Sequence, residues 1–215
     1  MTAPPTEPER VLRRRAARRR HGWRPRVSNT LFEGGLIVLS VVLGFAANAW
    51  GQRRADRARA AQALAAIRLE LQANRVVAAA AETHHRLVHD SLAPYVRAGA
   101  RPPERIYYYG NMFSPARVLG TAWTSAREGR ATDEMPYDLV LHLAQVYSRQ
   151  DQYRALGDAL IASLYADMLR RGGPAVFRDG AANFDLLARD FADRERDLVA
   201  EYDSALAHVG RARPR

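Results

Sequence analysis

Cysteine is absent from the 215 residues, and each of the 33 residues counted as Lys or Arg is an arginine. Without cysteine the chain can form neither a disulfide nor a thiolate metal site. The sequence also lacks a Gly-x-Ser-x-Gly turn, a phosphate-binding glycine loop and a zinc-protease motif. These are common signatures of hydrolases, nucleotide-binding enzymes and metalloproteases. We therefore predict a protein that is not an enzyme and has no cofactor.

The positive charge is concentrated at the two ends of the chain. Residues 1–59 contain 13 arginines and four acids, residues 60–210 contain 17 arginines and 19 acids, and the tail 211–215 contains three arginines. A nucleic-acid-binding domain spreads its basic residues over a folded face. Here most of the excess flanks an apolar segment, as in a membrane protein, so we expect no specific nucleic-acid partner.

A long apolar segment lies near the N-terminus. Residues 31–50 read LFEGGLIVLSVVLGFAANAW, and residues 36–47 carry no charge. Twenty helical residues extend about 30 Å, which matches the hydrocarbon core of a bilayer. Trp50 takes an interfacial position. We predict a transmembrane helix over 30–51, in preference to a buried core helix.

A cleaved signal peptide is the main alternative, because Ala47-Asn48-Ala49 fits a small-x-small cleavage site. We favour retention, since helix-forming sequence continues past Ala49 with no breaker except Gly51. Nine arginines precede the segment and four follow it closely. The excess of positive charge on the cytoplasmic side of membrane helices predicts a bacterial inner-membrane protein with a cytoplasmic N-terminus and a periplasmic C-terminal domain. The arm 1–29 should be disordered and attracted to anionic lipid.

The sequence after the apolar segment predicts a long helix. Residues 52–93 contain neither proline nor glycine. Small, apolar and occasional polar residues recur there at alternating spacings of three and four: Leu64, Ile67, Leu71, Asn74, Ala78, Ala81, His85, Val88 and Leu92. This heptad-like seam favours packing against other helices. We expect one helix from about residue 31 to 92, with a hinge near Gly51.

The remainder, 94–210, is predicted to complete an all-α domain, a helical bundle followed by the basic tail 211–215. Residues 94–113 are expected to form a loop, and only 105–109 alternate as a strand would. Capping residues and breakers set three further helices: Ser114-Pro115 to Gly129, Thr132–Pro136 to Gly172-Gly173-Pro174, and about 183–209 closed by Gly210. Trp123 is expected in the core.

Parts of the chain resemble an uncharacterised family of short bacterial single-pass inner-membrane proteins. The resemblance is carried by residues 36–75, LIVLSVVLGFAANAWGQRRADRARAAQALAAIRLELQANR, followed by His85 and Leu87. It continues in LGTAWTSAREGRA at 119–131 and LVLHLAQVYSRQDQY at 139–153. The family's usual acidic or polar residue before the membrane-exit tryptophan is replaced by Ala49. The resemblance implies the same membrane topology and no particular chemistry.

Four residues form a candidate metal site. Glu82, His85 and His89 share one helical face because they are three and four residues apart. Glu-x-x-His is half of the di-iron pattern of helical bundles, and His142 could complete a mononuclear site. The alternative is a partly buried polar layer. We favour the polar layer.

Two further sets of residues are candidate contact surfaces. Tyr107, Tyr108 and Tyr109 form an aromatic patch that could bind a partner, although a lid over the bundle is the favoured interpretation. A small-residue face in the apolar segment consists of Ser40, Gly44, Ala47 and Gly51. Small residues let another helix approach closely in lipid. This face favours self-association or docking onto a membrane protein complex.

These features together predict a non-catalytic accessory or scaffold subunit. It would associate with another membrane protein, or with copies of itself, through its transmembrane and periplasmic helices. One alternative is a periplasmic ligand-binding sensor, which the short cytoplasmic arm disfavours because it leaves no room for a signalling domain. Another is a helical-bundle enzyme with a His/Glu metal site.

Overall fold

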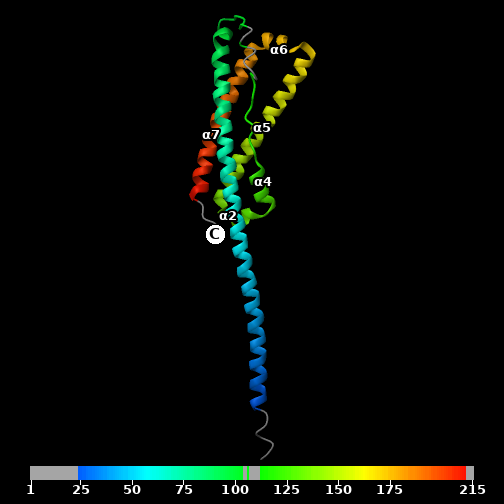
Figure 1. Ribbon diagram of the computed structural model, residues 1–215, viewed down its shortest axis with the longest axis vertical. Coiled ribbons are helices and arrows are strands. Elements are labelled where there is room, and N and C mark those ends of the chain that lie inside the picture. Colours follow the sequence, from blue (N-terminus) through cyan, green and yellow to red (C-terminus); the bar gives the residue numbers. More distant parts are fainter. Residues whose placement is uncertain (1–23, 104–105, 107–111, 212–215) are drawn as a thin grey trace, which may run out of the picture. The chain divides into compact units, whose positions relative to one another are not determined.

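A computed structural model describes residues 24–103, 106 and 112–211, and within these residues the protein is helical without strands (Figure 1). The all-α prediction is therefore confirmed. The elements are α2 (Arg24–Arg97), α4 (Thr121–Glu128), the 3-10 helix η1 (Ala131–Glu134), α5 (Tyr137–Arg171), α6 (Gly173–Asp179) and α7 (Ala181–Arg211). The chain divides into two units, 1–54 and 55–215, and each is considered by itself.

In the first unit, α2 contains a segment long and apolar enough to cross a membrane. Every residue from 32 to 54 is exposed, including Ile37 and Leu43. The helix begins at Arg24, so it includes the last residues of the arm expected at 1–29, while residues 1–23 lie outside the described residues. No break occurs at Gly51, because the helical hydrogen bonding continues through it. The hinge expected near this glycine stays a prediction.

In the second unit, the remainder of α2 buries one face. All nine residues of the predicted seam are buried: Leu64, Ile67, Leu71, Asn74, Ala78, Ala81, His85, Val88 and Leu92. The spacing of three and four therefore identified the core-facing stripe of this helix correctly. The helix continues past the expected end at 93, includes Pro94 and stops at Arg97.

The other long helices, α5 and α7, pack against each other, and α6 contacts both. Their inward faces supply most of the remaining core: Leu139, Leu143, Val146, Tyr147 and Tyr153 from α5, and Phe184, Phe191, Leu198, Tyr202 and Val209 from α7. α5 ends where expected, at Gly172, whose φ of 80° suits a glycine. The expected stop at Gly210 is wrong, since α7 runs on to Arg211, and the short helix α6 was not expected.

The helix expected to start at Ser114-Pro115 begins later, at Thr121. Residues 113–120 form no regular element, and we call residues 112–120 the linking segment. Pro115 lies against α5 at Gly157, where an added Cβ would be 3.3 Å from the Cβ of Pro115. The predicted end of the helix at Gly129 is confirmed. Trp123 is buried as predicted, and its ring stacks on Tyr147 at a centroid distance of 5.5 Å.

Candidate functional site

The linking segment is held by polar side chains that project from three helices into the domain. Because it has no helical hydrogen bonds of its own, its backbone N–H and C=O groups need other partners. Asn74 of α2 supplies two of them. Its Nδ2 donates to the carbonyl of Leu119 at 2.7 Å, and its Oδ1 accepts from the Leu119 N–H at 2.8 Å. The amide thus replaces the pairing that a neighbouring strand would give.

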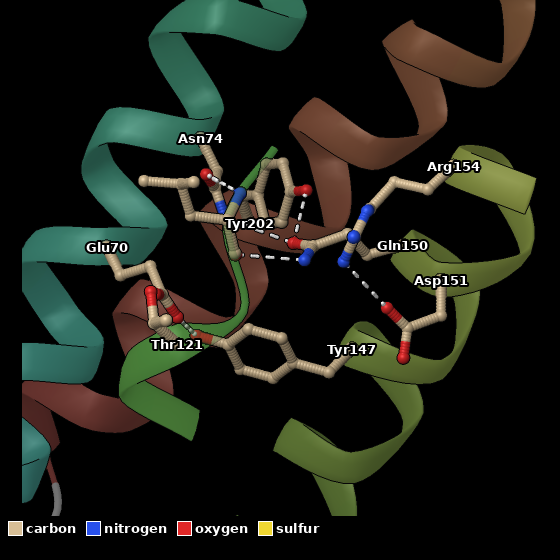
Figure 2. A network of polar contacts seen from close by, with 9 residues as sticks. Glu70, Asn74, Thr121, Tyr147, Gln150, Asp151, Arg154 and Tyr202 are labelled. Atoms are coloured by element: carbon tan, nitrogen blue, oxygen red, sulfur yellow. Dashed lines mark hydrogen bonds and ion pairs between the residues drawn. The ribbon is translucent and has the colours of Figure 1, made fainter. Parts of the chain in front are cut away.

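Gln150 of α5 and Tyr202 of α7 extend this arrangement, as Figure 2 shows. Gln150 donates from Nε2 to the same carbonyl of Leu119 at 2.9 Å. Its Oε1 accepts from Asn74 Nδ2 at 3.0 Å and from the Tyr202 hydroxyl at 2.8 Å. All three side chains are almost fully buried. The carbonyl of Leu119 therefore links α2 and α5, because it accepts from both Asn74 and Gln150. Tyr202 joins α7 to them through its hydrogen bond to Gln150.

Glu70 sits one turn before Asn74 and holds the start of α4. Its Oε2 accepts from the Thr121 hydroxyl at 3.0 Å and from the Ala122 N–H at 2.8 Å. Its Oε1 accepts from the Tyr147 hydroxyl at 2.8 Å. A carboxylate at the first turn of a helix satisfies N–H groups that have no partner within the helix. Glu70 is thus the acceptor that caps α4.

A second cluster lies nearer the C-terminal end of α2. It contains His85 of α2, Tyr153 of α5 and Glu195 of α7. Glu195 of α7 is fully buried; its Oε2 lies 2.8 Å from His85 Nδ1, and its Oε1 accepts from the Tyr153 hydroxyl at 2.5 Å. This cluster also binds the linking segment. The Ser114 N–H donates to His85 Nε2 at 3.2 Å, and the Ala116 N–H donates to the Tyr153 oxygen at 2.7 Å.

These contacts determine which nitrogen of His85 carries the proton. Nε2 accepts from a backbone N–H, so it must be unprotonated, and Nδ1 must carry the hydrogen that it donates to Glu195. His85 is therefore the neutral Nδ1–H tautomer in this arrangement. Phe113 and Phe191 flank its ring, with centroids 5.5 Å and 5.7 Å away. The histidine serves as a bridge between backbone and carboxylate.

The three tyrosines of the two clusters are kept neutral. Burial raises the pKa of Tyr147, and the neighbouring Glu70 raises it further. Burial likewise raises the pKa of Tyr153, followed by the effect of Glu195, and the pKa of Tyr202 is raised by burial and then by Glu70. Both carboxylates accept hydrogen bonds on both oxygens. The contacts shown at this site hold the protein's own backbone and side chains.

The four candidate metal ligands are not brought together. His85 is bound to Glu195, His89 Nδ1 lies 2.8 Å from Asp185 of α7, and Glu82 pairs with Arg86 on its own helix. His142 lies instead on α5 beside His208, with ring centroids 4.5 Å apart. Among the residues that the structure describes, no group of three or more His, Asp or Glu side chains is placed to hold a metal ion.

The other two sets of candidates are the tyrosine patch and the small-residue face of the apolar segment. Tyr107, Tyr108 and Tyr109 lie outside the described residues. Of the small-residue face, Ser40 donates to the carbonyl of Ile37 on its own helix. Gly44 and Gly51 have open space where a side chain would be, and Ala47 is exposed. The small-residue face is therefore exposed and open to contact by another helix.

Glu70, Gln150 and Glu195 were missed by sequence reasoning, although Asn74 and His85 were placed in the buried seam. A signal for Glu195 existed, because it falls on the same face as Phe191, Leu198 and Tyr202 at helical spacings. Comparisons of the chain with known protein families, with curated proteins and with solved structures found no match. The resemblance to single-pass bacterial proteins therefore stays a prediction.

Proposed function

We propose that this protein is a non-catalytic accessory subunit of a bacterial inner membrane. Its apolar helix is a permanent anchor, with the arginine-rich N-terminus in the cytoplasm and the domain 55–215 in the periplasm. The charge difference across the apolar segment supports this orientation. The N-terminal arginines would also bind anionic headgroups, each contributing about 1 kcal/mol near the surface.

The observation that carries the proposal is an exposed apolar face of α2 within the folded domain. Leu69, Val76 and Leu87 are 68%, 65% and 62% exposed. Between them, at the same alternating spacings of four and three, lie the exposed residues Ala73, Ala80 and Thr83. This face has no charged residue over five turns and is distinct from the buried seam. An amphipathic helix leaves such a face apolar when another helix covers it.

We assign this face to a helix of another membrane protein. The small-residue face of the anchor provides a second contact of the same kind, because Gly44 and Gly51 leave room for close approach of a neighbouring helix. Both contacts require a helical partner, and one of them requires a partner in the bilayer. The closed polar clusters support a rigid domain that presents a binding face. They do not resemble a cleft that turns over a substrate.

The test is purification of the full chain in mild detergent, followed by mass spectrometry of what remains bound. We expect a membrane protein to co-purify, and Val76→Glu to reduce its yield at least tenfold. Leu186→Glu is the matched control, because Leu186 is 66% exposed on α7 and lies off this face. It should leave co-purification unchanged.

A second pair of variants tests the anchor. Gly44→Leu should weaken association, while Gly35→Leu, on the opposite side of the helix and equally open, should not. Isolated monomers of the wild-type chain would contradict the proposal. A partner that consists only of further copies of this chain would replace the accessory role with a homo-oligomer.

A further inference from the structure

One histidine of α5 and one of α7 lie next to each other, and neither takes part in the polar clusters described above. His142 is on the first half of α5, and His208 is near the end of α7. Their ring centroids are 4.5 Å apart with an interplanar angle of 38°. Both side chains are partly exposed, so an ion could reach them from solution.

His208 is oriented as a metal ligand would be. Its Nδ1 lies 2.8 Å from the carbonyl oxygen of Ser204 one turn earlier. A carbonyl can only accept, so Nδ1 carries a hydrogen, and Nε2 is the nitrogen left to bind a metal. A histidine that ligates a metal through one nitrogen commonly donates from the other to a backbone carbonyl, which fixes the tautomer and the ring.

His142 approaches the same turn of α7. The Nε2 of His142 lies 3.4 Å from the Ser204 hydroxyl, a long contact that an ion could replace. Two imidazoles bound to one ion by bonds of about 2.1 Å have ring centres on the order of 5 Å apart, close to the observed separation.

We infer that His142 and His208 form a two-histidine site for a divalent transition-metal ion such as Zn²⁺, Ni²⁺ or Cu²⁺. Imidazole nitrogens select these ions over Mg²⁺ and Ca²⁺, which prefer oxygen ligands. In the part of the chain that the structure describes, no third His, Asp or Glu completes the set. Water fills the remaining positions, and the site binds more weakly than a structural zinc site. The ion would clamp α5 to α7.

The experiment titrates the full chain in mild detergent with Zn²⁺ and follows binding by calorimetry and stability by thermal unfolding. We expect one ion per chain, a rise in Tm with Zn²⁺ and no rise with Mg²⁺. His142→Gln and His208→Gln should each weaken Zn²⁺ binding at least tenfold and abolish the rise in Tm. His84→Gln, a change of another partly exposed histidine on α2, should leave both unchanged.

The Cu²⁺-loaded chain gives an independent readout. Its electron paramagnetic resonance spectrum should show two nitrogen ligands, reduced to one in either variant. The inference is overturned if Zn²⁺ does not bind, or if both glutamine variants bind it as tightly as the original chain.

Discussion

The two parts of α2 place similar residues in opposite environments. Between 32 and 54 every residue is exposed, whereas between 64 and 92 nine residues at spacings of three and four are buried. Ile37 is 63% exposed and Ile67 is fully buried, although both are isoleucines in one helix. The two parts of the helix differ in how their apolar residues are distributed around it. A stretch that is apolar on all sides needs an apolar surrounding, while a single apolar stripe needs only a neighbouring helix.

Removal of the buried Glu195 carboxylate should lower the stability of the folded domain more than any other change proposed here. Glu195→Ala leaves the Nδ1–H of His85 and the hydroxyl of Tyr153 without their acceptor. We expect a loss of about 2–6 kcal/mol in the free energy of unfolding, since each buried donor left unpaired costs about 1–3 kcal/mol. The loss is measured by urea unfolding in mild detergent followed by circular dichroism. Asp193→Ala, which removes an exposed pair with Arg196, should cost at most about 1 kcal/mol. Equal effects would show that the buried cluster does not stabilise the domain.

The same side-chain truncation in each half of α2 sharpens the comparison directly. Ile67→Ala should lower the free energy of unfolding by about 2–5 kcal/mol, because it leaves a cavity in the core. Ile37→Ala removes the same atoms from an exposed position outside the folded domain and should not change the unfolding transition. A shift in that transition for Ile37→Ala would mean that the apolar segment packs on the domain.

A smaller effect is expected at Asn74, which binds the linking segment. Asn74→Ala leaves the N–H and the carbonyl of Leu119 without this partner, although Gln150 still reaches the carbonyl. We expect a loss of about 1–3 kcal/mol and faster hydrogen exchange of the Leu119 amide, measured by nuclear magnetic resonance. Unchanged exchange at Leu119 would contradict the role assigned to Asn74.

Alkaline pH should lower the stability of the folded domain, which contains the buried tyrosines, and leave the exposed apolar segment unaffected. Burial raises the pKa of Tyr147, Tyr153 and Tyr202, so the folded domain holds these protons more tightly than the unfolded chain. Their contribution is complete below the unfolded tyrosine pKa of about 10 and is lost as the pH rises beyond it. Tyrosinate absorbance from these residues should appear together with unfolding. Ionisation of all nine tyrosines near pH 10 while the domain remains folded would contradict their burial.

Local pattern was enough to predict much of the fold. The seam from Leu64 to Leu92 was found because each of its residues recurs at helical spacing, and this held even for the polar Asn74 and His85. The end of α5 was predicted from the helix breakers Gly172-Gly173-Pro174, and in the structure Gly172 adopts a positive φ. Such features depend on neighbours in sequence.

What sequence missed depends on distant contacts. Ser114-Pro115 is a good helix start by composition, but the N–H groups of Ser114 and Ala116 find acceptors on α2 and α5, and the helix starts only at Thr121. Likewise His142 was grouped with α2 by residue type, whereas the packing of α5 on α7 pairs it with His208. Neither partner is encoded within a few residues of the group it binds.

The most direct test of the membrane assignment is to fractionate cells that express the full chain, wash the membranes with high salt and determine the intact mass of the protein. We expect the protein to stay in the washed membranes and to retain its arginine-rich N-terminus. Recovery in the salt-washed soluble extract, or a mature polypeptide that starts at Trp50, would contradict it.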